Sequence, residues 1–178
     1  QIQLGLIASN PTVHHGGEHY DLELSDSVHP SREQLKIYAR RWADAIAIHV
    51  LGETDGLTLG PKILSVGFDA GSPSLVNLAI GYEASESAYA APFHKPANPE
   101  ALAIADAGAP FDTIAITGSD WIGDTLQLTL AAPLSAGGPV VYAPFGEVSF
   151  TDRANLIRTI HADPDEEKPL RSFYRPPS

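Results

Sequence analysis

The feature that most constrains the fold of this chain is a series of short apolar segments in its second half, separated by Gly-, Pro- and Asp-containing turns. Such a series is typical of antiparallel strands in a sandwich or barrel. Residues 125–130 alternate between polar and apolar side chains, as a half-buried strand does. We therefore predict a small antiparallel β-sandwich or jelly roll. The predicted strands are Lys62–Asp69, Leu75–Tyr82, Ala101–Asp106, Phe111–Thr117, Thr125–Ala131 and Pro139–Ala143.

The beginning of the chain has a different character. Residues Ile2–Ala8 are almost continuously apolar, which is typical of a strand buried on both faces of a parallel sheet. A long polar loop follows over residues 10–30, and loops of that length in compact domains are often functional. We therefore expect α/β architecture here, in contrast to the all-β second half.

A helix is predicted to begin after Ser31 and to end at Gly52. Ser31 and Gln34 have the spacing of a capping box, and Gly52 is suited to a helix C-terminus. The apolar stripe of this amphipathic helix is predicted from three- and four-residue spacing. Its members are Leu35, Tyr38, Trp42, Ile46 and His49. The residues predicted to lie mostly off the stripe are Arg32, Lys36, Arg40, Arg41 and Asp44.

Composition excludes several classes of protein. The 178 residues include 22 Asp and Glu against 11 Lys and Arg, a formal net charge of −11. This balance argues against binding to nucleic acid or to an anionic membrane surface. No apolar run is long enough to cross a bilayer. The absence of Cys excludes disulfides, thiolate metal sites and a Cys nucleophile.

The chain has no Met and starts at Gln1, with neither the charged region nor the cleavage site of a signal peptide. We therefore expect it to derive from a longer polypeptide. Two units are predicted: residues 1–55, the C-terminal portion of an α/β domain, and residues 56–178, a β-sandwich-like module with an extended C-terminal tail. The acidic run 163–167 in that tail is predicted to be solvated.

Asp26 and His29 are the candidate catalytic residues. They lie three positions apart, after the predicted buried strand and before the capped helix. In a hydrolytic triad an imidazole takes a proton from the nucleophile, and a carboxylate holds that imidazole in the required tautomer. The alternative is a helix-entry loop in which Asp26 is solvated and His29 is half exposed.

The segment Asp26-Ser-Val-His29-Pro-Ser, followed by a helix containing Tyr38 and Trp42, resembles the last motif block of SGNH/GDSL-type esterases. The later motifs are similar to the C-terminal region of sialate O-acetylesterase-like proteins, and their order covers nearly the whole chain. These motifs are Gly60–Val66, Val140–Ala143, Asn155–Arg158 and Pro169–Phe173. The last one departs from the family's Pro-x-x-Phe-Arg pattern.

The resemblance implies acyl transfer through a serine ester, with His29 as general base and then general acid and Asp26 as its orienting partner. It implies an O-acetyl group on a carbohydrate as substrate, no cofactor, no metal, and an extracellular or periplasmic location. The family's Gly-Asp-Ser nucleophile block and its oxyanion-hole Gly and Asn are not found here. Gly118-Ser119-Asp120 has those residue types in another order and is assigned to a turn. The nucleophile and oxyanion hole are therefore expected on an upstream N-terminal segment or a separate chain, without which this chain is inactive.

Other interpretations stay open. A His cluster could bind a transition metal in a metal-dependent hydrolase, or it could be solvated. Its members are His14, His15 and His19, with Glu18 and Asp21 nearby and Gly16-Gly17 making the loop pliable. Aromatic residues of the β module could form a sugar-stacking surface or belong to the core. These are Tyr82, Tyr89, Trp121 and Tyr142. The whole chain could also be a noncatalytic module that binds glycan or another subunit.

Overall fold

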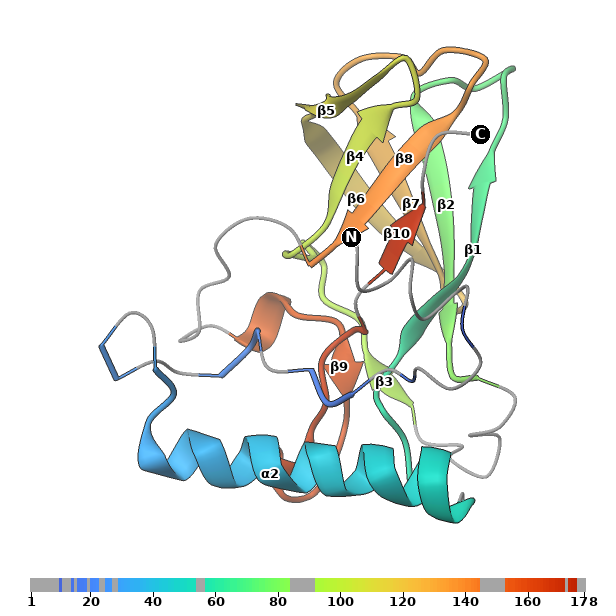
Figure 1. Cartoon of the computed structure of the whole chain (residues 1–178). Helices are drawn as coiled ribbons and strands as arrows, with labels where there is room; N and C mark the ends of the chain where they lie inside the picture. The colour runs from blue at the N-terminus through green and yellow to red at the C-terminus, as the bar shows by residue number, and fades with distance from the viewer. Residues whose placement is uncertain are drawn as a thin grey trace.

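The structure, a computed structural model, describes residues 10, 14, 16–18, 20–22, 25–26, 29–53, 57–83, 92–144, 153–171 and 173–175. A long helix lies at one end of the molecule, and the two larger sheets lie at the other (Figure 1). The predicted strand Ile2–Ala8 falls outside the described residues. The α/β portion and the domain boundary after residue 55 therefore stay predictions.

The helix predicted after Ser31 is confirmed. Helix α2 (Arg32–Ile46) has Ser31 as its N-cap, and the Ser31 hydroxyl accepts a hydrogen bond from the Gln34 backbone N–H at 3.3 Å. Helix α2 continues into a π-helical turn, η1 (Ala47–Leu51), which ends at Gly52. Gly52 has a φ of 73°, a left-handed conformation that glycine adopts without the clash a side chain would introduce.

The predicted apolar stripe of the helix is wrong as a description of its buried face. The row that is buried consists of Ile37, Arg41 and Ala45 in α2, followed by Ile48 in η1. Ala45 and Ile48 pack with Leu59 in a small apolar cluster. Arg41 can occupy this row because a buried carboxylate neutralises its charge. The stripe residues Leu35, Trp42 and Ile46 are exposed.

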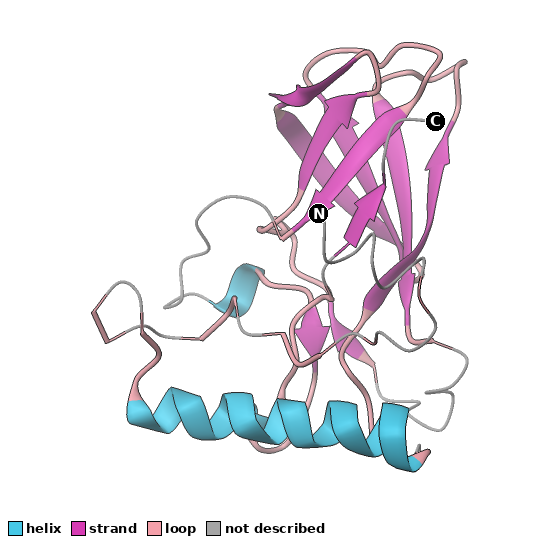
Figure 2. Cartoon of the chain, viewed as in Figure 1, coloured by secondary structure: helices cyan, strands magenta, loops and turns pink. Residues whose placement is uncertain are grey.

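The second half of the chain forms the predicted antiparallel β structure (Figure 2). One four-stranded sheet has the order β1 (Lys62–Phe68), β2 (Leu75–Gly81), β7 (Thr125–Leu130) and β6 (Ile116–Ile122). The other has the order β10 (Phe173–Arg175), β8 (Pro139–Ala143), β4 (Ala103–Asp106) and β5 (Ala109–Ile114). Every strand pair within the described residues is antiparallel.

One apolar core joins these two sheets. Leu78 and Leu128 from the first sheet and Ile104 and Val141 from the second are fully buried in the same cluster. The alternation predicted for residues 125–130 is confirmed, since every second side chain of β7 is buried. Each fully buried Leu or Ile of this kind stabilises the fold by about 1.5–3 kcal/mol.

The segment predicted as one strand over Phe111–Thr117 is two strands, β5 and β6, which belong to different sheets. Gly118-Ser119-Asp120 lies inside β6, so its assignment to a turn is wrong. β6 is an edge strand with a register shift between Ile116 and Gly118. Small and polar residues are tolerated at such an edge because their side chains need not pack in the core.

The C-terminal region lies between the sandwich and α2 (Figure 1). It contains η3 (Arg153–Asn155), η4 (Pro164–Glu166) and β9 (Arg158–Thr159), which pairs with β3 (Phe93–His94). Asp163 and Asp165 are exposed, as predicted for the acidic run, but Glu167 is buried.

The extended surface tail predicted after Asp163 is wrong for residues 167–171, which are all buried. These residues are held by their backbone. The Thr159 N–H donates to the Lys168 carbonyl at 2.9 Å, and the Leu170 N–H donates to the Ile157 carbonyl at 2.8 Å. The Arg171 N–H donates to the Pro61 carbonyl, also at 2.8 Å. Backbone pairing with two distant segments therefore overrides the polar composition of the tail. Among the described residues, no helix has the length and apolar character needed to span a membrane.

Candidate functional site

Asp26 and His29 lie in contact in the loop before α2. The Asp26 carboxylate oxygens are 2.9 and 3.1 Å from His29 Nδ1, and one of them also accepts the His29 backbone N–H at 2.8 Å. Ser25 closes the turn from the other side, because its N–H and hydroxyl donate to the His29 carbonyl at 2.7 and 2.9 Å. The two candidate residues therefore lie in contact, and their catalytic role stays a prediction.

This contact has a defined chemical consequence. A carboxylate on Nδ1 favours the neutral tautomer in which Nδ1 carries the proton and Nε2 is the proton acceptor. The His29 side chain is 74% exposed and that of Asp26 57% exposed. In this environment water competes with the contact, so the pair contributes little to stability.

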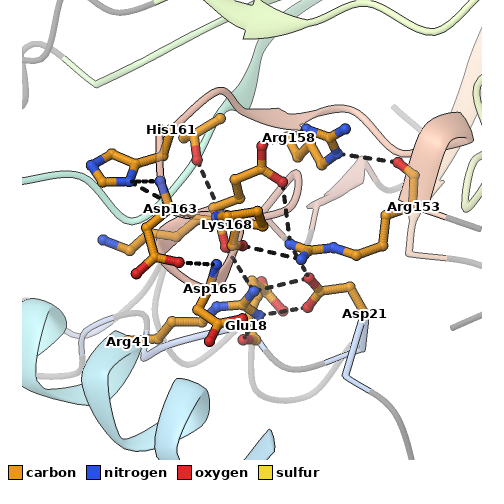
Figure 3. Close-up of polar contacts among 12 residues, drawn as sticks. Glu18, Asp21, Arg41, Arg153, Arg158, His161, Asp163, Asp165 and Lys168 are labelled. Atoms are coloured by element: carbon orange, nitrogen blue, oxygen red, sulfur yellow. Dashed lines mark hydrogen bonds and ion pairs between the residues drawn. The ribbon is translucent and has the colours of Figure 1, made fainter. Parts of the chain in front are cut away.

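A second carboxylate in the same loop, Asp21, is buried and paired (Figure 3). Its oxygens accept hydrogen bonds from Arg41 Nη1 at 2.5 Å and Arg41 Nη2 at 2.9 Å. A bidentate Arg–carboxylate pair fixes the orientation of both groups as well as their separation. Arg153 Nη2 lies 3.3 Å from the same carboxylate.

Arg41 connects three segments of the chain. Besides Asp21, its Nη1 donates to the Glu18 carbonyl at 2.9 Å and its Nη2 donates to the Glu167 carbonyl at 2.7 Å. The side chain of Glu167 in turn accepts from Arg158 Nη1 at 2.8 Å. The C-terminal region and the loop before α2 are therefore joined through one helix side chain.

The two glycines of the loop allow close packing on α2. A Cβ at Gly16 would lie 2.8 Å from the Trp42 ring, and a Cβ at Gly17 would lie 2.7 Å from the Arg41 Cβ. Both distances are too short for any side chain. Glycine is therefore required at position 17, where the loop meets the helix backbone, whereas at Gly16 the contact is with the outer atoms of the exposed Trp42 ring.

Tyr20 provides a further link between the loop and the C-terminal region. Its hydroxyl donates to the Leu170 carbonyl at 2.8 Å. Burial raises the pKa of the Tyr20 hydroxyl well above 10.0, and the negative charges of Glu18 and Asp21 act in the same direction. Tyr20 is therefore neutral and available as a donor throughout the physiological range.

The residues of the predicted metal cluster are used in other ways where the structure describes them. The His14 ring stacks on His49 with ring centroids 4.6 Å apart. Asp21 is committed to arginine, and His15 and His19 lie outside the described residues. Within the described part of the chain, no three His, Asp or Glu side chains are arranged to hold a metal ion.

The aromatic residues of the β module belong to different parts of the core. Trp121 packs on Phe93 with ring centroids 5.8 Å apart, and its indole N–H donates to the Pro96 carbonyl at 2.9 Å. Tyr82 packs against the same core, whereas Tyr142 is buried in the other sheet. Tyr89 lies outside the described residues. The core interpretation therefore holds for the three described residues.

Of the serines near the pair in the sequence, Ser25 and Ser31 are described, whereas Ser9 and Ser27 lie outside the described residues. The Ser31 hydroxyl caps α2. The Ser25 hydroxyl donates to the His29 backbone carbonyl at 2.9 Å, so it stabilises the turn. Ser119 donates to the Ala97 carbonyl at 2.5 Å from an edge strand of the sandwich. Neither hydroxyl is bonded to the His29 ring.

Sequence reasoning missed the pairing of Asp21 with Arg41. Arg41 stands four residues after Ile37 and four before Ala45, so its place in a buried row could have been found from spacing. Its partner could not, because Asp21 precedes it by 20 positions with no repeating pattern between them.

Comparison of the chain with protein-family models, with curated proteins and with solved structures finds no match in any of the three.

Proposed function

We propose that the chain is the C-terminal part of a serine esterase that removes O-acetyl groups from carbohydrate. In this proposal His29 is the general base and then the general acid, and Asp26 orients it. The serine nucleophile and oxyanion hole lie on an upstream segment or a separate chain. The observation that carries the proposal is the contact of the Asp26 carboxylate with His29 Nδ1 at 2.9 Å. The substrate class rests on the resemblance to sialate O-acetylesterase-like proteins.

The direction of the imidazole supports this role. With Nδ1 bound to the carboxylate, Nε2 lies on the other side of an exposed ring. Nε2 is the atom that would take the proton from a serine hydroxyl and return it to the leaving group. A serine in this role must approach within hydrogen-bond distance, about 2.6–3.2 Å.

The exposure of the pair supports a partner. Proton transfer and oxyanion stabilisation are stronger where water is excluded, so an active site would need a second surface over His29. Apolar side chains that such a surface could cover follow on α2 and η1. These exposed residues are Leu35, Trp42, Ile46, Val50 and Leu51. We assign this face to the polypeptide that carries the serine.

The test begins with isolation of the native protein and mass spectrometry of everything that copurifies. We expect a polypeptide with a Gly-Asp-Ser block. The 178-residue chain is then coexpressed with that polypeptide and assayed with an aryl acetate and an O-acetylated sugar. His29→Ala and Asp26→Asn are each expected to lower kcat by on the order of 10³-fold or more.

His161→Ala is the matched control, because this exposed histidine forms its hydrogen bonds with the Asp163 backbone in the C-terminal region. It is expected to leave turnover unchanged. Unchanged turnover in His29→Ala would overturn the proposal. Loss of activity with a chelator, restored by zinc, would favour the metal-dependent alternative. Glycan binding without hydrolysis would favour a noncatalytic module.

A further inference from the structure

The loop that carries Asp26 and His29 is fixed at both ends, although the pair itself is exposed. On one side it leads into α2 through the N-cap residue Ser31. On the other side Asp21 is buried, and both of its oxygens are bound by Arg41. Leu22, the next residue, is also buried. The described residues on either side of the pair are therefore held by these two anchors, whereas the exposed pair itself contributes little to stability.

Arg41 is suited to this anchoring because of its shape. Its planar guanidinium reaches the Asp21 carboxylate, the Glu18 carbonyl and the Glu167 carbonyl at once, at distances of 2.5–2.9 Å. A lysine keeps the charge but cannot make the paired, coplanar hydrogen bonds. Glu167 is 126 positions from Arg41 in the sequence, so the C-terminal region takes part in the same anchor.

We propose that Arg41 and Asp21 are positioning residues for His29: their buried ion pair holds the loop in the path that brings the Asp26 carboxylate to His29 Nδ1. The importance of this positioning for catalysis rests on the proposed esterase function. The coupling between the buried pair and the exposed pair is a property of the loop and can be measured without substrate.

The test uses the 178-residue chain labelled with ¹⁵N. In the wild type we expect the neutral His29 ring to carry its proton mainly on Nδ1, as read from the two ring ¹⁵N chemical shifts. In Arg41→Lys we expect a shift of the tautomer population toward the Nε2-protonated form. We also expect the exchange protection of the Ser25 and His29 amides to fall about tenfold, which corresponds to about 1.4 kcal/mol.

Two controls separate positioning from general destabilisation. Arg40→Lys alters the neighbouring exposed pair with Glu166 and is expected to leave the His29 tautomer unchanged. Leu126→Ala opens a cavity in the sandwich core without removing any hydrogen bond of the anchor, and it is also expected to leave the tautomer unchanged. A tautomer shift in Leu126→Ala as large as in Arg41→Lys would overturn the proposal.

A folded Arg41→Lys protein with the wild-type tautomer and wild-type amide protection would also overturn it. If Arg41→Lys does not fold, Asp21→Asn replaces it, because an amide keeps the shape of the carboxylate but loses its charge. We expect the same tautomer shift and the same loss of amide protection, and wild-type values of both would overturn the proposal. Failure of the esterase proposal is recognised separately. It is unchanged turnover in His29→Ala, which leaves the tautomer result standing.

Discussion

Asp21 and Asp26 are two carboxylates of one loop, five residues apart. Asp21 contacts the guanidinium of Arg41, and Asp26 contacts the imidazole of His29. Asp21 and Arg41 have side chains only 1% and 3% exposed, whereas Asp26 and His29 are 57% and 74% exposed. Removing one partner from a buried ion pair leaves an uncompensated charge, but at the surface water replaces the partner. Burial therefore makes the first pair a structural anchor, whereas the second pair stays accessible to solvent.

The largest expected effect is that of Arg41→Met. Among the described residues, the substitution leaves only Arg153, at 3.3 Å, to neutralise the buried Asp21 carboxylate. We expect the free energy of unfolding to fall by about 3–5 kcal/mol, measured by urea denaturation followed by circular dichroism. The double variant Arg41→Met with Asp21→Asn should lose less, because no charge is stranded. A loss below about 1 kcal/mol in the single variant would contradict the conclusion that the buried pair contributes more to stability than an exposed pair.

An intermediate effect is expected for Lys168→Met. Lys168 forms an ion pair with Asp44 across the junction of α2 and the C-terminal region, and the two side chains are 9% and 21% exposed. We expect a loss of about 1–2 kcal/mol in the free energy of unfolding, between the values for buried and surface pairs. Lys36→Met, which removes an exposed pair with Glu33, is the matched control. Equal losses in the two variants would show that burial does not determine how much each ion pair contributes to the free energy of unfolding.

Tyr20→Phe is expected to cost about 1 kcal/mol at neutral pH, because it removes the hydrogen bond to the Leu170 carbonyl. The folded-state pKa of Tyr20 is raised above its unfolded value near 10.0. Its contribution is therefore fully present below pH 10.0 and is lost as the pH rises toward the folded-state pKa. Urea titrations of both proteins at neutral pH and above pH 10.0 should show the difference shrinking. A constant difference would contradict the assignment of Tyr20 as a buried donor.

The smallest expected effect on stability is that of His29→Ala. Because the ring is exposed and its hydrogen bond to a described residue lies within its own turn, the free energy of unfolding should change by less than about 0.5 kcal/mol. The same denaturation experiment checks this, with Arg41→Met measured in parallel. A loss comparable to that of Arg41→Met would mean that the exposed pair is itself an anchor.

Much of the fold was predictable because it depends on local pattern. The cap at Ser31, the stop at Gly52 and the alternation of residues 125–130 each act over a few residues, and all three are found in the structure. The errors arose where tertiary contacts override composition. Gly118-Ser119-Asp120 looks like a turn but pairs as an edge strand, and Glu167 looks solvated but is buried among arginines.

The candidate site divides in the same way. The proximity of Asp26 to His29 was predictable, because a separation of three positions keeps the two side chains within reach of each other. The anchor of that loop was not predictable, because Asp21, Arg41 and Glu167 come from three separate segments. These three residues come into contact only after the chain has folded.

The sequence by itself determined the helix and most of the strands, since short-range spacing and backbone preferences decide them. Only the tertiary structure decided which face of α2 is buried and where the C-terminal segment lies. The physical reason is that the cost of burying a charge depends on partners brought from distant parts of the chain, and no local pattern encodes them.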